Sequence, residues 1–390
     1  MLKVLAIVPC PQVFGLQIMT LRFFERLSGK INSHFLVTRW TDGEFSRRLD
    51  ELAIPYSYSW LGMISRKLDR RNLDMTIGCV KKLPVLYRDF MRLVRSYRPD
   101  VIYTANYHQL ILLWPVLLLL RAPVVYHVHN SLPTGLFYRF SFFFWKRVVD
   151  HYLCVSNSVA ASVSSLGVGP KHLSLLYNGV DLTRFQYVGS RSCCFSAGYG
   201  WPDASVIVGM TGQMGEIKGH FDLLDAARII HDKHPEVRFV IGGKQDGSYF
   251  RQLQERMREN NLDDVVGFSG WQDDMLNFYE GLDIFVFPSR CDEAFGLVIA
   301  EAMATGLPVV ATHTGGAVEV IEDQRTGIVV ERESPYQLSE AISSLVAARS
   351  KRVSMGKAGR QRVEQFFDLS KQAAELEKIL ETVAKSHNRS

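Results

Sequence analysis

The chain has 390 residues, of which 47% are hydrophobic and 22% are charged. This length exceeds one ordinary hydrophobic core and suits two domains of typical size. A formal net charge of only +5 argues against a disordered chain and against a surface built to bind nucleic acid. We therefore expect two folded domains and no nucleic-acid partner.

The cysteines and the hydrophobic runs indicate the cellular compartment of the protein. The six cysteines are scattered without a C-x-x-C pair, which indicates reduced thiols in a cytoplasmic protein and no zinc site. The apolar start, Met1 to Pro9, is too short for the core of a signal peptide and predicts a buried first strand. The run from Leu110 to Leu120 is broken by Pro115. It is well short of the ~20 residues of a membrane span, so we expect a buried helix there.

Short β-branched runs alternate with longer amphipathic runs, which is typical of βα units around parallel sheets. The first series of predicted strands comprises Val4 to Val8, His34 to Thr38, Val101 to Thr104, Val124 to Val128, His151 to Val155 and Leu173 to Leu176. The second series comprises Ser205 to Met210, Val237 to Gly242, Val265 to Ser269, Ile284 to Pro288, Val309 to Thr312 and Ile328 to Val330. Helices are predicted at Phe221 to Lys233, Ser248 to Asn260, Asp273 to Gly281, Leu297 to Thr305 and Pro335 to Ala347.

This alternation predicts an α/β protein with two parallel-sheet domains that face a cleft. We assign residues 1–187 to the first domain and 204–369 to the second. A stretch rich in glycine and serine, residues 188–203, is expected to connect them. Residues 354–390 are helical by composition, and the last helix, about 370–390, is expected to pack back on the first domain.

The segment from Phe287 to Pro308 is the richest in residues that can carry chemistry. A buried strand ends at Pro288, a polar loop follows, and a helix is predicted from about Leu297 to Gly306, where glycine suits a left-handed cap. Ligands bind at the carboxyl ends of parallel strands, so this loop is a candidate ligand site.

Glu293 and Glu301 bracket the Phe-Gly turn in this segment. On a single helix they would lie ~12 Å apart along the axis, whereas glycosidase carboxyl pairs lie about 5 to 9.5 Å apart, which disfavours a hydrolase pair. With Glu293 in the loop, the two can hold hydroxyl groups at opposite ends of one ligand, and the helix amino terminus between them can bind a phosphate. The alternative is that Glu301 pairs locally and Glu293 is a solvated loop residue.

Two further positions follow predicted strands. Lys218, in the segment from Gly212 to Gly219, can neutralise charge that builds on a leaving diphosphate; the alternative is a solvated lysine. His129 follows the strand Val124 to Val128, and a histidine bonded to the backbone is the alternative there. Near the amino terminus, Gly15 lies in the segment from Pro9 to Ile18, where a glycine lets the backbone approach a ligand closely.

Several short motifs follow one another along the chain. They are Tyr177-Asn178-Gly179-Val180-Asp181, Lys218-Gly219, Gly242-Gly243, Val266-Gly267-Phe268-Ser269-Gly270, Glu293 with Glu301, and Thr314-Gly315-Gly316. In this arrangement the chain resembles the GT-B-fold glycosyltransferases of family 4, also called glycosyl transferases group 1. The resemblance implies two Rossmann-like domains facing a central cleft. It also implies retaining transfer from a nucleotide sugar, without a metal ion or other cofactor.

The resemblance also implies roles for single residues. Glu293, Lys218 and His129 would act in catalysis, with His129 facing the transferred sugar or the acceptor. The donor would be bound by Gly15, Gln213, Gly243, Trp271, Phe295, Gly296, Leu297, Val298 and Glu301. Family members commonly have an arginine where this chain has Gln213, and glutamine loses both the charge and the bidentate fork.

Two stretches of the first half bear on the acceptor. Residues 66–98 are strongly basic, and the aromatic run Leu136 to Arg147 carries phenylalanine and tryptophan beside lysine and arginine. This combination is typical of contact with an anionic membrane surface and favours a lipid-linked glycan acceptor at the inner face of the cytoplasmic membrane. The alternative is an ordinary solvated basic face with a core aromatic helix.

We expect a glycosyltransferase of cell-surface polysaccharide or glycolipid synthesis. A sugar-nucleotide epimerase or hydrolase is an alternative because one fold hosts many reactions, and so is a non-catalytic partner subunit. A dehydrogenase is disfavoured because no G-x-G-x-x-G follows the first strand.

Overall fold

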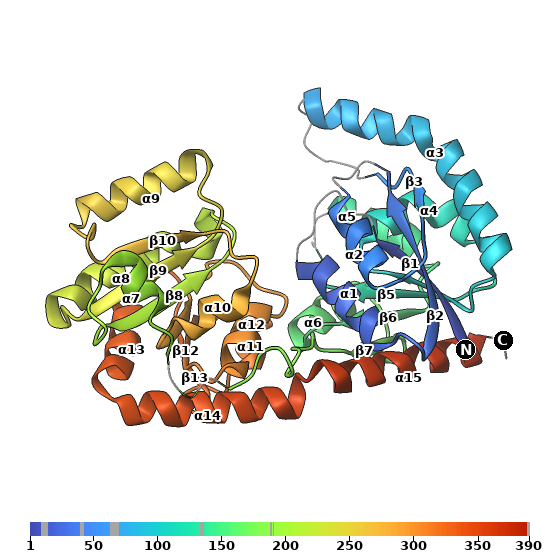
Figure 1. Ribbon diagram of the computed structural model, residues 1–390. Coiled ribbons are helices and arrows are strands. Elements are labelled where there is room, and N and C mark those ends of the chain that lie inside the picture. The colour runs from blue at the N-terminus through green and yellow to red at the C-terminus, as the bar shows by residue number, and fades with distance from the viewer. Residues whose placement is uncertain are drawn as a thin grey trace. The chain divides into compact units, whose positions relative to one another are not determined.

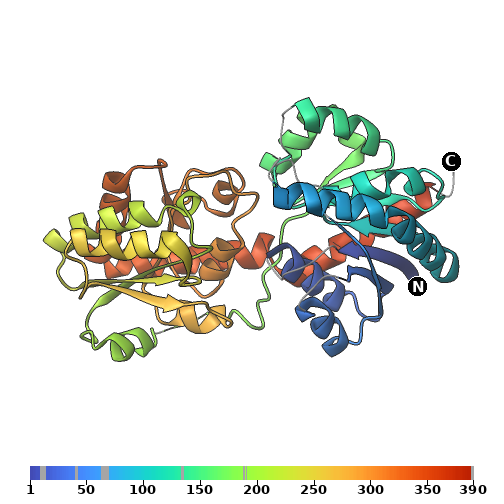
Figure 2. The ribbon, with the colours of Figure 1, turned by 90° about the horizontal axis from the view of Figure 1, so that it is seen from above.

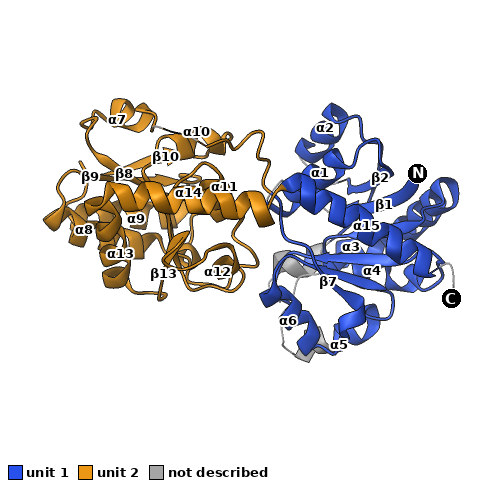
Figure 3. Ribbon diagram, turned by 90° about the horizontal axis from the view of Figure 1, so that it is seen from below, with its two compact units in different colours: residues 1–179, 369–390 blue, residues 180–368 orange. Residues whose placement is uncertain are grey.

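A computed structural model describes residues 1–8, 15–39, 43–62, 70–132, 136–187, 189 and 191–387, with the side chains of 70–73, 75 and 136–139 excepted. The chain forms two compact units (Figure 3). Unit 1 comprises Met1–Gly179 with Leu369–Ser390, and unit 2 comprises Val180–Asp368. Each unit is an α/β layer structure of its own, and the predicted fold class is confirmed.

Unit 1 is built on a parallel sheet with the strand order β3-β2-β1-β4-β5-β6-β7. The strands are β1 Leu2–Val8, β2 Ile31–Thr38, β3 Tyr56–Ser59, β4 Val101–Thr104, β5 Val124–Val128, β6 His151–Cys154 and β7 Leu173–Leu175. The helices are α1 Gly15–Arg26, α2 Glu44–Glu51, α3 Arg70–Tyr97, α4 Tyr107–Leu117, α5 Leu136–Trp145, α6 Asn157–Ser165, the 3₁₀ turn η1 Pro170–His172 and α15 Leu369–His387. The edge strand β3 is the one strand of this sheet that the sequence did not predict.

Unit 2 is built on a second parallel sheet with the order β10-β9-β8-β11-β12-β13. The strands are β8 Val206–Thr211, β9 Val237–Gly242, β10 Val266–Gly270, β11 Ile284–Phe287, β12 Val309–Thr312 and β13 Gly327–Val330. The helices are α7 Cys194–Tyr199, the 3₁₀ turn η2 Glu216–Lys218, α8 His220–Lys233, α9 Gly247–Glu259, α10 Met275–Glu280, α11 Leu297–Ala304, α12 Ala317–Val320, α13 Pro335–Ala347 and α14 Arg349–Phe366. All six predicted strands of this sheet are confirmed.

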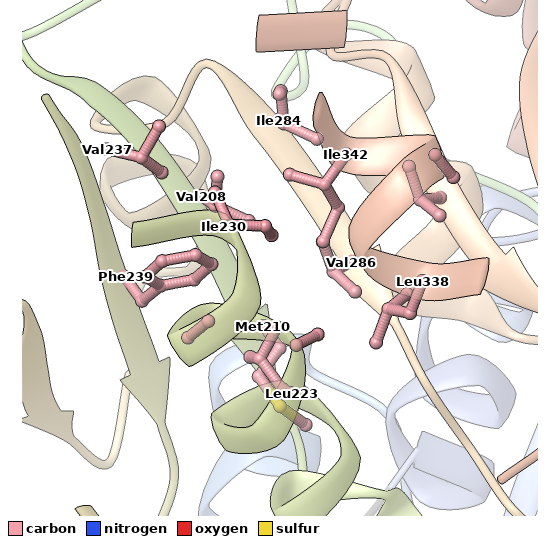
Figure 4. Close-up of a cluster of buried hydrophobic side chains, with 14 of the residues drawn as sticks. Val208, Met210, Leu223, Ile230, Val237, Phe239, Ile284, Val286, Leu338 and Ile342 are labelled. Atoms are coloured by element: carbon pink, nitrogen blue, oxygen red, sulfur yellow. The ribbon is translucent and has the colours of Figure 1, made fainter. Parts of the chain in front are cut away.

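Both sheets are covered on their two faces by helices (Figures 1 and 2). Parallel strands that are buried on both sides read as almost continuous apolar runs, and every residue of β5, β11 and β12 is buried. In unit 2, Val208 and Phe239 of the sheet pack against Ile230 of α8 and Ile342 of α13 (Figure 4). This core fixes the strands whose carboxyl ends carry the site described below.

The chain passes between the units at residues 179–180 and again at 368–369. The backbone N–H of Val180 donates to the carbonyl of Phe367 at 2.7 Å, so the two passes run side by side. The sequence suggested a connection over 188–203, but α7 lies in that stretch, and its Phe195 packs so closely on Gly281 that a Cβ there would meet the ring at 2.5 Å. The last helix, α15, packs on α1 and β4 of unit 1. None of the helices in the described ranges combines the length and apolar character needed to cross a bilayer.

Candidate functional site

A lysine and a glutamate meet at the carboxyl end of the unit 2 sheet. Lys218 ends η2, after β8, and Glu293 lies in the loop after β11. These strands are neighbours in the sheet although β9 and β10 lie between them in sequence, so this is the point where strand order reverses and ligands bind in such sheets. Lys218 Nζ lies 2.6 Å from Glu293 Oε1, and the two side chains keep 22% and 18% exposure. The sequence predicted both positions, and the structure brings them into contact.

The Glu293 carboxylate is held through one of its two oxygens. Besides Lys218, the hydroxyl of Ser289 donates to Oε1 at 2.8 Å and the Cys291 thiol lies 3.8 Å from it. Ser289 is almost fully buried, and its own carbonyl accepts from the Thr312 hydroxyl at 2.5 Å. Within the described ranges no hydrogen bond reaches Oε2, which leaves that oxygen able to accept one from a ligand hydroxyl.

The main chain of Glu293 is fixed by the turn that follows β12. Gly316 N–H donates to the Glu293 carbonyl at 2.7 Å. Gly315 has φ +39°, and a Cβ built there would lie 2.6 Å from the same carbonyl. The Thr314-Gly315-Gly316 motif therefore has a physical reason: only glycine lets the two loops approach this closely.

Helix α11 begins directly after this loop, as the sequence predicted. Gly296, at its N-cap, has φ +85° and makes no side-chain capping bond. Among the described residues, no acceptor bonds the backbone N–H groups of Leu297 and Val298, which open the helix. Such groups, with the positive end of the helix dipole, favour a phosphate.

Glu301 lies one turn into α11 and is almost fully buried. The Tyr279 hydroxyl on α10 lies 3.4 Å from its Oε2 and 3.1 Å from the Val298 carbonyl, to which it donates. Phe295 is also buried, and its ring packs on Phe367 at 5.4 Å between centroids. Any contact of Phe295 with a donor would therefore come from its backbone, because its side chain belongs to the core.

The remaining donor positions of unit 2 lie at the ends of β8, β9 and β10. Gly243 N–H donates to the Gly270 carbonyl at 2.8 Å, and a Cβ on Gly243 would lie 2.6 Å from the Gly212 carbonyl. Gln213 is exposed beside this contact. Trp271 is 59% exposed, with its indole N–H donating to Asp273 at 3.0 Å. A free indole face of this kind can stack on a flat ring.

In unit 1, His129 directly follows β5 and packs on His127. Their ring centroids are 4.1 Å apart, and the Tyr103 hydroxyl lies 2.7 Å from His127 Nδ1. Burial lowers the pKa of His129 to about 3 and, together with the neighbouring imidazole, lowers the pKa of His127 well below its ordinary value. In the described part of the chain, Nε2 of each ring has no hydrogen-bond partner. Both imidazoles are therefore neutral at neutral pH, and His129, at the edge of the buried pair, retains hydrogen-bonding capacity at Nε2.

Gly15 is exposed at the first position of α1 in unit 1. Residues 9–14 of the loop that the sequence assigned to ligand contact lie outside the described residues. The structure thus gathers Lys218, Glu293, Glu301 and the start of α11 in unit 2, while His129 and Gly15 lie in unit 1. Ser289 and Tyr279 were missed by sequence reasoning, because an ordinary serine and a core tyrosine carry no pattern of their own.

Comparison with known proteins gives two family matches. The Glycosyltransferase Family 4 model matches residues 16–184, and the Glycosyl transferases group 1 model matches residues 195–362. Together these ranges take in most of the described chain.

Curated relatives match about half of the chain at about 30% identity or less. A D-inositol 3-phosphate glycosyltransferase of Corynebacterium kroppenstedtii is 30% identical over 50% of this chain and 45% of its own length. A lipopolysaccharide core biosynthesis mannosyltransferase, LpsB of Rhizobium meliloti, is 26% identical over 54% of this chain and 61% of its own length. The chain thus spans about half the length of the curated relatives it matches.

A solved structure of Anabaena HepE in complex with UDP and glucose superposes with a TM-score of 0.82 at 20% identity. It covers 98% of this chain and all of HepE. At this identity the likeness establishes a shared fold.

Proposed function

The chain belongs to glycosyltransferase family 4, and we propose that it is a retaining enzyme that moves a sugar from a nucleotide-diphosphate sugar to a glycan or lipid-linked glycan. The observation that carries this proposal is the contact of Lys218 with Glu293 beside the open start of α11. A cation, free N–H groups and a spare carboxylate oxygen at one strand end match a diphosphate joined to a sugar.

The chemistry follows from where each group lies. As the bond between the anomeric carbon and the phosphate oxygen breaks, negative charge develops on the diphosphate, which Lys218 and the N–H groups of Leu297 and Val298 stabilise. Glu293 Oε2 accepts a hydrogen bond from a sugar hydroxyl. The acceptor oxygen bonds to the anomeric carbon from the face that the phosphate leaves, and its proton passes to the departing phosphate oxygen. Configuration is then retained without a strong protein base.

Donor recognition extends away from the diphosphate in both directions. Glu301 binds the ribose in this proposal, and the exposed indole of Trp271 stacks on the nucleobase. With Gln213 in place of the usual arginine, Lys218 is in this proposal the cation that unit 2 presents beside Glu293 in the described part of the chain. The lysine and helix terminus supply the charge stabilisation that a metal would otherwise give, so transfer should continue unchanged in EDTA.

His129 contributes a neutral imidazole to the reaction. Because burial lowers its pKa to about 3, it acts as a hydrogen-bond donor or acceptor toward the sugar or acceptor and carries no charge. We expect His129→Ala to reduce kcat about 10- to 100-fold while nucleoside diphosphate affinity stays within threefold. Equal losses in both quantities would contradict this role.

The acceptor assignment is supported by an apolar and basic surface of unit 1. Phe140 and Phe143 of α5 are 67% and 46% exposed, and the Arg147 guanidinium lies 4.3 Å from the centre of the Phe143 ring. Leu118 and Leu119, at the end of α4, are exposed as well, and α4 contacts α5. Exposed rings beside cations suit the interface of an anionic bilayer. We therefore place the reaction at the inner face of the cytoplasmic membrane, with a lipid-linked glycan as acceptor.

Vesicle binding tests this surface. The full chain should sediment with vesicles that contain anionic phosphatidylglycerol at low salt, and should remain in solution with neutral phosphatidylcholine. Phe140→Ser with Phe143→Ser should reduce binding at least fivefold, because the double variant loses two exposed rings that the bilayer would bury. Tyr336→Ser, which removes an exposed ring of α13 in unit 2, is the control. Binding that is equal for both variants, or none at all, would rule out the membrane contact.

The activity is tested by thermal-shift screening against UDP, GDP and ADP, followed by their sugars. A ligand that binds the folded state raises the melting temperature by mass action. The donor that binds is then incubated with glycan acceptors, and the anomeric configuration of the product is read by NMR. Transfer with retention supports the proposal. Free sugar or an isomerised nucleotide sugar without an acceptor would identify a hydrolase or epimerase instead, and no turnover at all would favour a partner subunit.

A further inference from the structure

A partly buried ion pair joins the loop that carries Glu293 to the helix that directly follows Lys218. Arg290, in the loop after β11, donates from Nε and Nη2 to the carboxylate of Asp222 at 2.7 and 2.6 Å. Asp222 lies in the first turn of α8, and its side chain is only 6% exposed. A two-bond fork between a planar guanidinium and a carboxylate fixes orientation as well as distance.

The main chain joins the same loops on either side of Lys218. Arg290 N–H donates to the Ile217 carbonyl at 2.8 Å, directly before Lys218. Directly after it, Gly219 lies so close to the end of β11 that a Cβ there would meet the Pro288 carbonyl at 1.8 Å. Both contacts hold the start of the β11 loop, and Glu293, three residues beyond Arg290, is held in turn by Gly316 and Ser289. The fork adds a side-chain restraint between this loop and α8, the helix that directly follows the Lys218 segment.

We propose that Arg290 and Asp222 are positioning residues that set the geometry of the Lys218 and Glu293 pair. They act through these two side chains and touch no substrate themselves. The inference rests on the proposed function, because it assigns the clamp to the step in which Lys218 serves the diphosphate and Glu293 serves the sugar. A displacement of about 1 Å in such a site can lower the rate 100-fold.

The chain provides a matched control for this clamp. Arg256 on α9 makes the same two-bond fork with Asp225, one turn further along α8, at 2.9 and 3.0 Å. It joins two helices and does not contact the loop after β11. Arg256→Met therefore removes the same kind of ion pair from the same helix without touching the catalytic loops.

The test compares kcat, donor KM, nucleoside diphosphate Kd and melting temperature for Arg290→Met, Arg290→Lys and Arg256→Met. We expect Arg290→Met to lower kcat at least 10-fold with Kd within threefold, because the start of α11 still holds the diphosphate. Arg290→Lys should recover part of kcat by making one of the two bonds. Arg256→Met should leave kcat within twofold of wild type.

Two results would overturn the clamp. One is an Arg290→Met enzyme with wild-type kcat. The other is that Arg290→Met and Arg256→Met lose kcat in the same proportion to their loss of melting temperature, which would indicate a purely structural role. A ligand-free crystal structure of Arg290→Met, or of Arg290→Lys if the methionine variant does not fold, gives a readout independent of turnover. An unchanged contact between Lys218 and Glu293 there would also overturn the clamp. Failure of the wild-type protein to transfer any sugar would count against the proposed function, while a displaced pair in the crystal would still support the clamp.

Discussion

In unit 2, the loops after β8 and β11 bring a cation and an anion into contact, and both side chains remain partly exposed. In unit 1, the residues at the end of β5 include two imidazoles, His127 and His129, which are almost fully buried and pack on each other with tilted rings. Both sets lie at the carboxyl ends of parallel strands. The comparison shows that one architecture can hold a charged site by hydrogen bonds and ion pairs, and a neutral site by burial.

The charged site of unit 2 is tested most directly by substituting Glu293. Glu293→Gln keeps the shape of the side chain and the bond from Ser289 but removes the charge that holds Lys218. We expect kcat to fall about 10²- to 10³-fold, while affinity for the nucleoside diphosphate stays equal or rises, because Lys218 is freed for the phosphate. Steady-state kinetics and isothermal titration calorimetry measure the two quantities.

Glu340→Gln is the control for this variant. Glu340 pairs with Lys233 at 3.1 Å on the exposed surface of unit 2, where such a pair contributes little. Its loss should change neither quantity. If Glu293→Gln kept full turnover, the proposed catalytic role of the Glu293 carboxylate would be wrong.

The close approach of the loops is probed by Gly219→Ala. Gly219 has φ +73°, and its added methyl would collide with the Pro288 carbonyl, so the end of β11 must shift away from α8. We expect the free energy of unfolding to fall by about 2 to 4 kcal/mol, measured by urea titration. Gly198→Ala, at a helical position with nothing within 4 Å, should cause no loss. An unfolding curve for Gly219→Ala that matches wild type would show that the loops can separate freely.

The buried histidine site of unit 1 is tested by the pH dependence of stability. Burial lowers the pKa of His129 to about 3, so between that value and the ordinary 6.5 the unfolded chain binds a proton that the folded chain does not. Stability is therefore complete above pH 6.5 and is lost as the pH falls. For this one histidine the loss is about 1.4 kcal/mol between pH 7.5 and pH 5.5.

His129→Asn should remove that share of the pH dependence of urea unfolding. Gln252→Asn, on the exposed face of α9, changes no titrating group and should leave the slope unchanged. The same slope in both variants would mean that His129 is protonated in the folded protein, and the contrast between the two units would then disappear.

The smallest effect is expected from adding charge to unit 2. Gln213→Arg places a second cation near Lys218, so we expect the donor to bind about 3- to 10-fold more tightly, with a stronger dependence on salt. Gln252→Arg, on the exposed face of α9, adds the same charge elsewhere. If the two variants bind the donor equally, position 213 does not contact the diphosphate.

Much of the fold was predictable because the strands of a doubly covered parallel sheet must be apolar along their whole length. The strand β3 escaped prediction because it lies at the edge, where it pairs with β2 alone and its sequence alternates tyrosine with serine. Helix α7 was not predicted because its six residues show no clear helical periodicity of apolar side chains. The glycine and serine content around it suggested a connection.

The candidate site was predictable where chemistry imposes a residue type, as for Lys218, Glu293 and the glycines. Its supports were not, because they depend on contacts distant in sequence. Ser289 reaches Thr312 of β12, and Arg290 reaches back 68 residues to Asp222. The inward direction of Phe295 depends on Phe367, which arrives from the end of α14. The catalytic and binding roles themselves stay predictions that the variants above can test.

The return of α15 to unit 1 has a consequence for how the protein is made. Most of unit 1 precedes unit 2 in sequence, yet Leu376 and Leu380 of α15, which are fully buried, leave the ribosome after all of unit 2. Unit 2 is continuous in sequence and is complete earlier. Synthesis therefore finishes the second unit before the first, which inverts the usual order of co-translational folding. A nascent chain released at residue 368 would carry a finished unit 2 and an amino-terminal unit without one of its own helices.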